Sequence, residues 1–487
     1  MKNRIKQYLL AASMCVGLTA CSDFFEPIPG VQFGLDETFA SKQRTEEYLN
    51  NVYSYVREVT DAIHPNTYGG IFTEASLDGA NRWNKTYAEW TNGSFNSASA
   101  QASEYFSKYY QAIAKASTFI QNVDKCTEAA ASTRGKWKSE ARALRAYYYF
   151  ELLRLYGPIP LIGEDPIPLD ASLEELIKER NSVDECVNFI ATELQSAIDS
   201  GDLLQRAGKA NLGRMDVATC MALKAKLYLY WASPLFNGNT DQASVKNKDG
   251  KQLFPQTEDH SKWTQTRDAY ERFMTFATGQ GYKLTEVYTN GKLDPYASCR
   301  AAGEFFTTTW EAVDELIFVK LRDLYDYTYW VCPKFTDFQD TDVTGGGGYY
   351  TTQETVDLFF TKDGLTIEED PGYDKFEGIP GANNFTSGRY YDPNNPSRLY
   401  FDADKSKVLK QWKDREPRFY VNITYSGSIW LNEGKYNEEM RTDFTNGANG
   451  TCGKSKASGD CPDSGYLIRR GAKASNNNGS KHFSPVL

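Results

Sequence analysis

Apolar residues in the first half of the chain recur at the spacing of an amphipathic helix. In residues 104–123 and 134–156 they lie close to one face of a 3.6-residue repeat, and Gly157-Pro158 is a stop signal for the second helix. The same pattern predicts helices over 215–232 and 264–277. The expected buried positions are Tyr105, Tyr109, Ile113, Ala116, Ile120 and Val123, followed by Trp137, Ala141, Leu144, Tyr148, Leu152 and Leu155.

A further helix start is marked by Ser182 and Glu185, which have the spacing of a capping box. The helix that follows should bury Val183, Val187, Ile190, Leu194 and Ile198. Paired amphipathic helices with small residues at their contacts suggest stacking of the tetratricopeptide type, although no strict 34-residue repeat is present.

After about residue 280 the pattern changes. Helical spacing is found mainly at 352–361, and 370–400 is dense in Pro, Gly and Asn, which predicts a loop. Alternation of apolar and polar residues at 420–425 predicts a strand. We therefore expect a mainly α fold, with a helical scaffold over about 35–280 and a loop-rich, partly β face over about 281–487.

The N-terminus has the features of a secretory signal over residues 1–20. Basic residues precede an apolar run from Tyr8 to Leu18, and Leu18-Thr19-Ala20-Cys21 follows. This end resembles a bacterial lipobox, which implies cleavage before Cys21 and acylation of Cys21. An ordinary signal peptide with an incidental Cys is the alternative. No other stretch is long and apolar enough to span a membrane.

The amino-acid composition limits which kinds of ligand the protein could bind. The formal net charge is −10 without a basic block, which makes nucleic acid an unsuitable ligand. The cysteines left after Cys15 and Cys21 are odd in number and scattered, although Cys452 and Cys461 could close a small loop. Aromatic residues make up 14% of the chain, with 32 Tyr and 9 Trp. Their flat apolar faces and polar edges complement sugar rings.

Two adjoining segments resemble the signature of the SusD/RagB family of nutrient-binding outer-membrane lipoproteins. They are 140–150 (EARALRAYYYF) and 155–161 (LYGPIPL). Supporting resemblances occur at 109–110, 120–123, 224–230 and 415–420. Family members usually continue beyond a segment like 465–470 into a last helical pair, so we expect that this C-terminal pair is missing here.

This resemblance implies a single SusD-like domain over 21–487, a superhelix of α-helical pairs. It also implies that the domain is anchored by lipid at the outer membrane and exposed at the cell surface. It implies non-catalytic capture of an oligosaccharide and delivery to a SusC-type TonB-dependent transporter. No cofactor or metal is implied. A peptide ligand, a surface glycosidase and a purely structural lid remain as alternatives.

Two aromatic segments are the candidate ligand-binding sites. The first is the loop with Asn81, Arg82 and Trp83, followed by Trp90; resemblance to the family points to this region. The second is Tyr325, Tyr327, Tyr329 and Trp330, whose alternation in a strand would place the tyrosines on one face. The alternative for both is packing against the core. Trp310 and Trp430 are weaker candidates.

Other chemistry has little support in the sequence. Residues 340–345 match the first half of a calcium loop, but position twelve is Thr351 rather than Glu, so an acidic turn is favoured. The three His, which are His64, His260 and His482, form no zinc motif. Glu368-Glu369-Asp370 could supply glycosidase carboxylates, yet a solvated turn is the simpler interpretation.

Overall fold

The computed structural model describes most of the chain after its N-terminal segment. The described residues are 34–57, 76, 79–81, 93–165, 167–168, 170–303, 314–323, 331–333, 346–376, 380–404, 407–431, 439–441, 461–469 and 481–485. Their helices are α2 (Leu35–Ala40), α3 (Lys42–Tyr53), α6 (Ala100–Asn122), α7 (Ala131–Tyr156), α8 (Leu173–Leu176), α9 (Val183–Asp199), α10 (Val217–Ala232), α11 (Ser261–Gly279), α12 (Pro295–Gly303), α14 (Gln353–Asp357) and α15 (Pro417–Asn422).

The strands of the described residues are short and fall almost entirely in the second half. They are β1 (Ala80–Asn81), β2 (Tyr288–Thr289), β3 (Lys292–Leu293), β4 (Val319–Asp323), β5 (Tyr349–Tyr350), β6 (Phe385–Thr386), β7 (Arg389–Asp392), β8 (Asn395–Asp402), β9 (Val408–Leu409), β10 (Ile423–Tyr425), β11 (Ile429–Leu431), β12 (Glu439–Arg441), β13 (Tyr466–Ile468) and β14 (Lys481–Pro485). The expected mainly α fold is confirmed.

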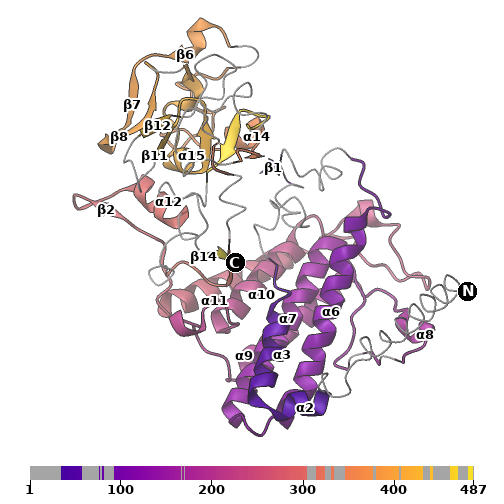
Figure 1. Cartoon of the computed structure of the whole chain (residues 1–487). Helices are drawn as coiled ribbons and strands as arrows, with labels where there is room; N and C mark the ends of the chain where they lie inside the picture. The colour runs from indigo at the N-terminus through magenta and orange to yellow at the C-terminus, as the bar shows by residue number, and fades with distance from the viewer. Residues whose placement is uncertain are drawn as a thin grey trace, which may run out of the picture.

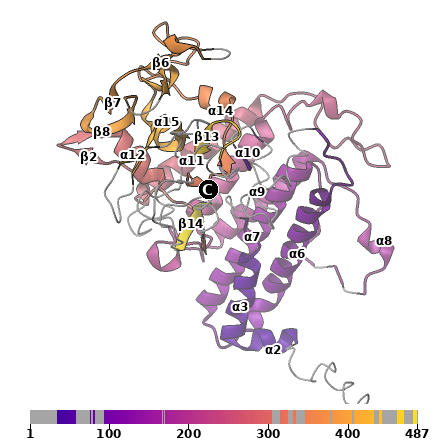
Figure 2. The same cartoon turned by 45° about the horizontal axis from the view of Figure 1, so that its top comes forward.

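Long helices form one half of the molecule, and most of the short strands gather in the other half (Figure 1). Strand β14, which pairs with β4, lies instead near α10 and α11. Neighbours in the sequence pack on each other, as α6 does on α7, α7 on α9, α9 on α10 and α10 on α11. Figure 2 shows α3, α6 and α7 running side by side. Within the described part of the chain, no helix has both the length and the apolar character needed to cross a membrane.

The predicted helix signals are confirmed at several positions. All six apolar positions predicted for 104–123 are buried, five of them in α6 and Val123 directly after it. Ser182 and Glu185 form the expected capping box of α9. Helix α7 ends at Gly157, whose φ of +67° is strained for other residues and whose added Cβ would lie 3.0 Å from Phe254 Cζ.

Helix α7 is more deeply buried than a single apolar stripe predicts. Between Ser139 and Leu153 every residue except Arg142 is buried. This helix therefore lies at the centre of the larger hydrophobic core, and its charged residues must find partners inside the protein.

Each buried charge of α7 has an opposite charge beside it. Arg145 Nε donates to Glu193 Oε2 of α9 at 2.9 Å. Glu140 lies 3.3 Å from Arg214 Nε and accepts a hydrogen bond from Tyr53 Oη, while burial raises the pKa of its carboxyl.

Glu151 is paired with Arg57 at 3.1 Å and with Arg154 at 2.8 Å. Burial alone would raise the pKa of this carboxyl, but Arg154 and Arg57 hold it below its ordinary value. The charges of α7 thus tie it to the segments that surround it.

Two expectations for the second half are wrong in part. The strand predicted over 420–425 begins only at Ile423, because Pro417 occupies the first turn of α15 and its fixed φ favours a helix start. The loop predicted over 370–400 contains β6, β7 and most of β8. The β7–β8 hairpin places the Tyr390 and Phe401 rings 5.1 Å apart, a long-range contact that local composition does not reveal.

We expect Glu193→Ala to lower the free energy of unfolding by about 3–5 kcal/mol, because it leaves Arg145 buried without its counter-charge. Urea unfolding followed by circular dichroism measures this change. Glu271→Ala is the matched control, since Glu271 is 69% exposed in a surface pair with Arg267 and should change stability by about 0.5 kcal/mol or less. Equal effects of the two substitutions would contradict this role for Glu193.

Candidate functional site

A small sheet joins segments that are far apart in the sequence. Its strand order is β1-β5-β13-β10. In register, Asn81 lies opposite Tyr349, Leu467 opposite Tyr350, and Thr424 opposite Leu467. The sheet therefore connects the N-terminal region with three parts of the second half.

The described residues that flank the two predicted aromatic segments contact β5 or the residues just before it. The chain leaves β1 at Asn81, which pairs with Tyr349, and continues into 82–90. The chain after 324–330 re-enters at 331–333, where Cys332 O accepts a hydrogen bond of 3.0 Å from Gly347 N–H. Gly347 and Tyr349 are two positions apart, so Asn81 and Cys332, which flank the two candidate segments, are held by neighbouring residues.

Most residues of the predicted site lie outside the described residues. Asn81 is placed in β1. The candidates outside are Arg82, Trp83, Trp90, Tyr325, Tyr327, Tyr329 and Trp330, together with Trp310, the lipidation residue Cys21 and the calcium-like residues 340–345. Of the two cysteines that could close a small loop, Cys461 is buried and Cys452 lies outside the described residues.

Two minor candidates are settled by the structure. Trp430 is 2% exposed in β11, with the Arg469 guanidinium 5.2 Å from its ring centroid, so it belongs to the core and cannot stack on a ligand. Glu368 and Glu369 are exposed, and Thr366 Oγ1 donates to Glu369 Oε2 at 3.0 Å. The prediction of a solvated acidic turn is confirmed there.

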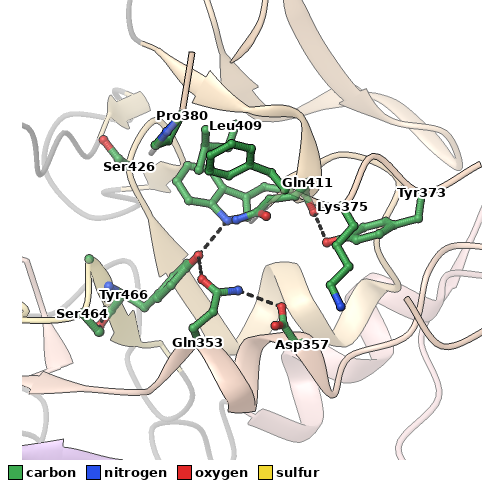
Figure 3. Close-up of a pocket in the computed structure, with 13 residues that line it drawn as sticks. Gln353, Asp357, Tyr373, Lys375, Pro380, Leu409, Gln411, Ser426, Ser464 and Tyr466 are labelled. Carbon is green, nitrogen blue, oxygen red and sulfur yellow. Dashed lines mark hydrogen bonds between the residues drawn. The ribbon is translucent and has the colours of Figure 1, made fainter. Parts of the chain in front are cut away.

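A pocket lies beside the sheet and was not predicted from the sequence (Figure 3). Its volume of about 640 Å³ is within the usual range for small-molecule sites. It combines aromatic, aliphatic and polar side chains. The lining residues are Gln353, Asp357, Tyr373, Lys375, Phe376, Pro380, Leu409, Gln411, Trp412, Ser426, Ser464, Gly465 and Tyr466.

A chain of hydrogen bonds runs along one side of this pocket (Figure 3). Trp412 Nε1 donates to Tyr466 Oη at 3.1 Å, and Tyr466 Oη donates to Gln353 Oε1 at 2.7 Å. The Gln353 amide nitrogen then donates to Asp357 Oδ1 at 2.7 Å. Burial raises the pKa of the Tyr466 phenol to about 12, so it stays protonated as a donor at neutral pH.

Arg415 is buried next to the pocket and fixes several of the residues that line it or adjoin it. Within the described residues its guanidinium donates to four backbone carbonyls, including those of Val356 at 2.8 Å and Phe359 at 2.7 Å, and to Tyr373 Oη at 2.8 Å. The carbonyl of Val356 belongs to the last turn of α14, where helical partners are missing, and that of Phe359 follows directly after the helix. One buried cation thus holds both the helix that carries Gln353 and Asp357 and the ring of Tyr373.

The charge of the pocket is balanced. Asp357 and Lys375 are the charged residues of its described lining, and the Lys375 ammonium lies 3.6 Å from Glu368. Within the part of the chain that the structure describes, no group of three or more His, Cys, Asp or Glu could hold a metal ion. The pocket therefore offers an aromatic floor with separate donors and acceptors, an arrangement suited to binding a neutral polar molecule.

Comparison with known proteins defines the class of this chain. The profile described as "SusD family" matches residues 315–484, and the SusD-like profile described as "Starch-binding associating with outer membrane" matches residues 32–229. The chain belongs to the SusD family, as its resemblance in sequence predicted.

Individual relatives agree with this assignment. A SusD-like protein of Bacteroides ovatus is 27% identical over 175 residues, which is 34% of this chain and only 30% of that relative. The solved structure of BT4246 has a TM-score of 0.73 at 23% identity, covering 92% of this chain and 76% of that one. A SusD-like protein of Bacteroides fragilis has a TM-score of 0.63 at 20% identity, covering 91% and 72%. The two structures support the fold.

We expect Arg415→Met to lower the free energy of unfolding by roughly 3 kcal/mol or more, since it leaves several buried acceptors without a donor. Urea denaturation provides the measurement. Arg418→Met is the control, because Arg418 is 55% exposed and pairs at the surface with Glu416, which should contribute about 1 kcal/mol or less. A loss in Arg415→Met no larger than in the control would show that Arg415 does not hold this region.

Proposed function

We propose that this chain is a cell-surface lipoprotein that binds a glycan without converting it. Acylated Cys21 would hold it at the outer membrane, and the aromatic segments at 81–90 and 325–330 would capture an oligosaccharide. Membership of the SusD family supports this class of function. The description of the profile that matches residues 32–229 names both starch binding and the outer membrane.

The observation that carries the proposal is the common anchor of the two aromatic segments. Asn81 pairs with Tyr349, and Cys332 is hydrogen-bonded to Gly347. A glycan is longer than a single aromatic ring, so it is best held by several rings on one rigid base. Strand β5 and Gly347 just before it would supply such a base for residues that are about 240 positions apart in the sequence.

The chemistry of the two segments suits sugars. Rings of Trp83 and Trp330 would stack on the C–H faces of pyranose units, each contact contributing roughly 1 kcal/mol. Asn81 and Arg82 would donate hydrogen bonds to hydroxyl oxygens. Because Asn81 and Arg82 directly precede Trp83 in the sequence, one sugar unit could contact both kinds of group at this segment.

Two alternatives differ in what happens to the ligand. A peptide ligand would use the same aromatic rings and is distinguished only by direct binding. A surface glycosidase would need two carboxylates that face a shared cleft. In the turn at 368–370, Glu369 and Asp370 accept local hydrogen bonds from Thr366 and Gly372, so this turn is a poor candidate for such a pair.

We expect Trp83→Ala and Trp330→Ala each to weaken binding of the cognate oligosaccharide about fivefold, because each removes one stacking contact of roughly 1 kcal/mol. Isothermal titration against glycan and peptide panels measures the affinity. Trp263→Ala is the matched control, since Trp263 is 42% exposed on α11, in the helical half. Unchanged affinity in both loop variants, or release of reducing sugar by the wild-type protein, would refute the proposal.

We further expect the lipoprotein to co-purify with a SusC-type TonB-dependent transporter from detergent-solubilised outer membranes, because capture alone does not move a glycan across the membrane. Affinity purification of the tagged full chain followed by mass spectrometry tests this. The control is a Cys21→Ala variant, which should lose the membrane fraction. Recovery of the wild-type chain from membranes without any such transporter would contradict the delivery role.

A further inference from the structure

The hydrogen bonds in the pocket of Figure 3 have a fixed direction. A carboxylate only accepts, so the nitrogen of the Gln353 amide must face Asp357 and its oxygen must face Tyr466. Trp412 can only donate, and it donates to the Tyr466 oxygen. The donors and acceptors that remain for a ligand can therefore be identified.

Both hydrogen-bond donors and hydrogen-bond acceptors of the pocket lining remain available to a ligand. Gln353 retains its second N–H, and the Asp357 carboxylate retains most of its acceptor capacity. Lys375 adds an ammonium donor to the lining. A sugar hydroxyl is donor and acceptor together, so it could donate to Asp357 and accept from Gln353 or Lys375. A ligand group that only accepts hydrogen bonds could use Gln353 and Lys375 but not Asp357.

The charge of the lining disfavours an anionic ligand. A carboxylated or sulfated sugar would approach Asp357 directly, and the Lys375 ammonium is already close to Glu368. Neither Arg of this region faces the opening as a counter-charge, because Arg415 is buried against carbonyls and Arg418 is paired with Glu416. An uncharged polyhydroxylated ring fits these groups best.

The described residues at the bases of the aromatic segments lie outside the pocket but belong to the same small sheet or adjoin it. Of the described residues at the bases of those segments, none in 79–81, 331–333 or 346–350 lines it. Helix α14 follows β5 after two residues, and Tyr466 belongs to β13, which pairs with β5. The same small sheet thus connects the pocket with the described bases of the aromatic segments.

We propose that the pocket formed by Gln353, Asp357, Lys375, Trp412 and Tyr466 is a second saccharide site, which takes an uncharged sugar residue of the glycan. The proposal rests on the glycan-binding function given above and adds a subsite and a preference for neutral sugars. The aromatic floor excludes water from one side of the ring, and the residues of α14 bind its hydroxyls.

The test uses the full chain without its signal and the neutral probes maltohexaose, cellohexaose and mannohexaose, with hexagalacturonate as the anionic probe. Affinities are measured by isothermal titration. We expect one neutral probe to bind, with Gln353→Ala and Asp357→Ala each weakening it about 5- to 10-fold, as for loss of a hydrogen bond to a polar or charged group. Glu354→Ala, on the same helix but outside the pocket, should leave the affinity unchanged.

A double variant separates this inference from the proposed function. Asp357→Ala and Trp83→Ala should have additive effects on binding free energy, because they act on separate parts of one ligand. If Trp83→Ala weakens binding but Gln353→Ala and Asp357→Ala do not, the pocket is not a subsite and the loop function stands. Tighter binding of hexagalacturonate than of every neutral probe would overturn the preference for neutral sugars. Failure of the wild type to bind any glycan would overturn both proposals.

Discussion

The burial of charged side chains on α7 is the constraint on which the helical half depends. Glu140, Arg145 and Glu151 lie within three turns of one helix and are almost completely excluded from solvent. An ion without a partner in such a place costs several kcal/mol, so α7 can be central only if its partners are present. Those partners come from the segment after α3, from α9 and from the loop before α10. The ion pairs therefore specify which elements surround α7, while apolar contacts supply most of the stabilisation.

A second buried cation organises the other half by a different means. Arg415 is satisfied by carbonyl and phenol oxygens, which ends α14 and holds Tyr373 near Trp412. The small sheet next to it brings β1 of the N-terminal region to β5 and β13. Short strands carry little stability alone. Here the strands hold segments that are distant in the sequence in one place.

Elements that depend on local interactions could be predicted from the sequence, whereas those that depend on long-range contacts could not. Helices α6, α9, α10 and α11 were predicted because periodicity and capping are local properties. The prediction failed at 417–422, where a proline begins a helix within an alternating pattern, and at the β7–β8 hairpin, which is stabilised by contacts such as Tyr390 with Phe401. The binding segments at 82–90 and 324–330 stay predictions. Their common anchor and the pocket with Trp412 and Tyr466 could not be predicted, because no local pattern relates residues 81, 349, 412 and 466.

The sequence by itself determined the helices, the family and the composition of the aromatic segments. Each of these depends on residues a few positions apart or on a recognisable segment such as 140–161. Only the tertiary structure decided that α7 is buried on nearly all sides, that Trp430 is core, and that Gln353, Asp357 and Tyr466 share one pocket. The physical reason is that burial and hydrogen-bond partners are set by which surfaces meet, and the chain meets itself across hundreds of residues.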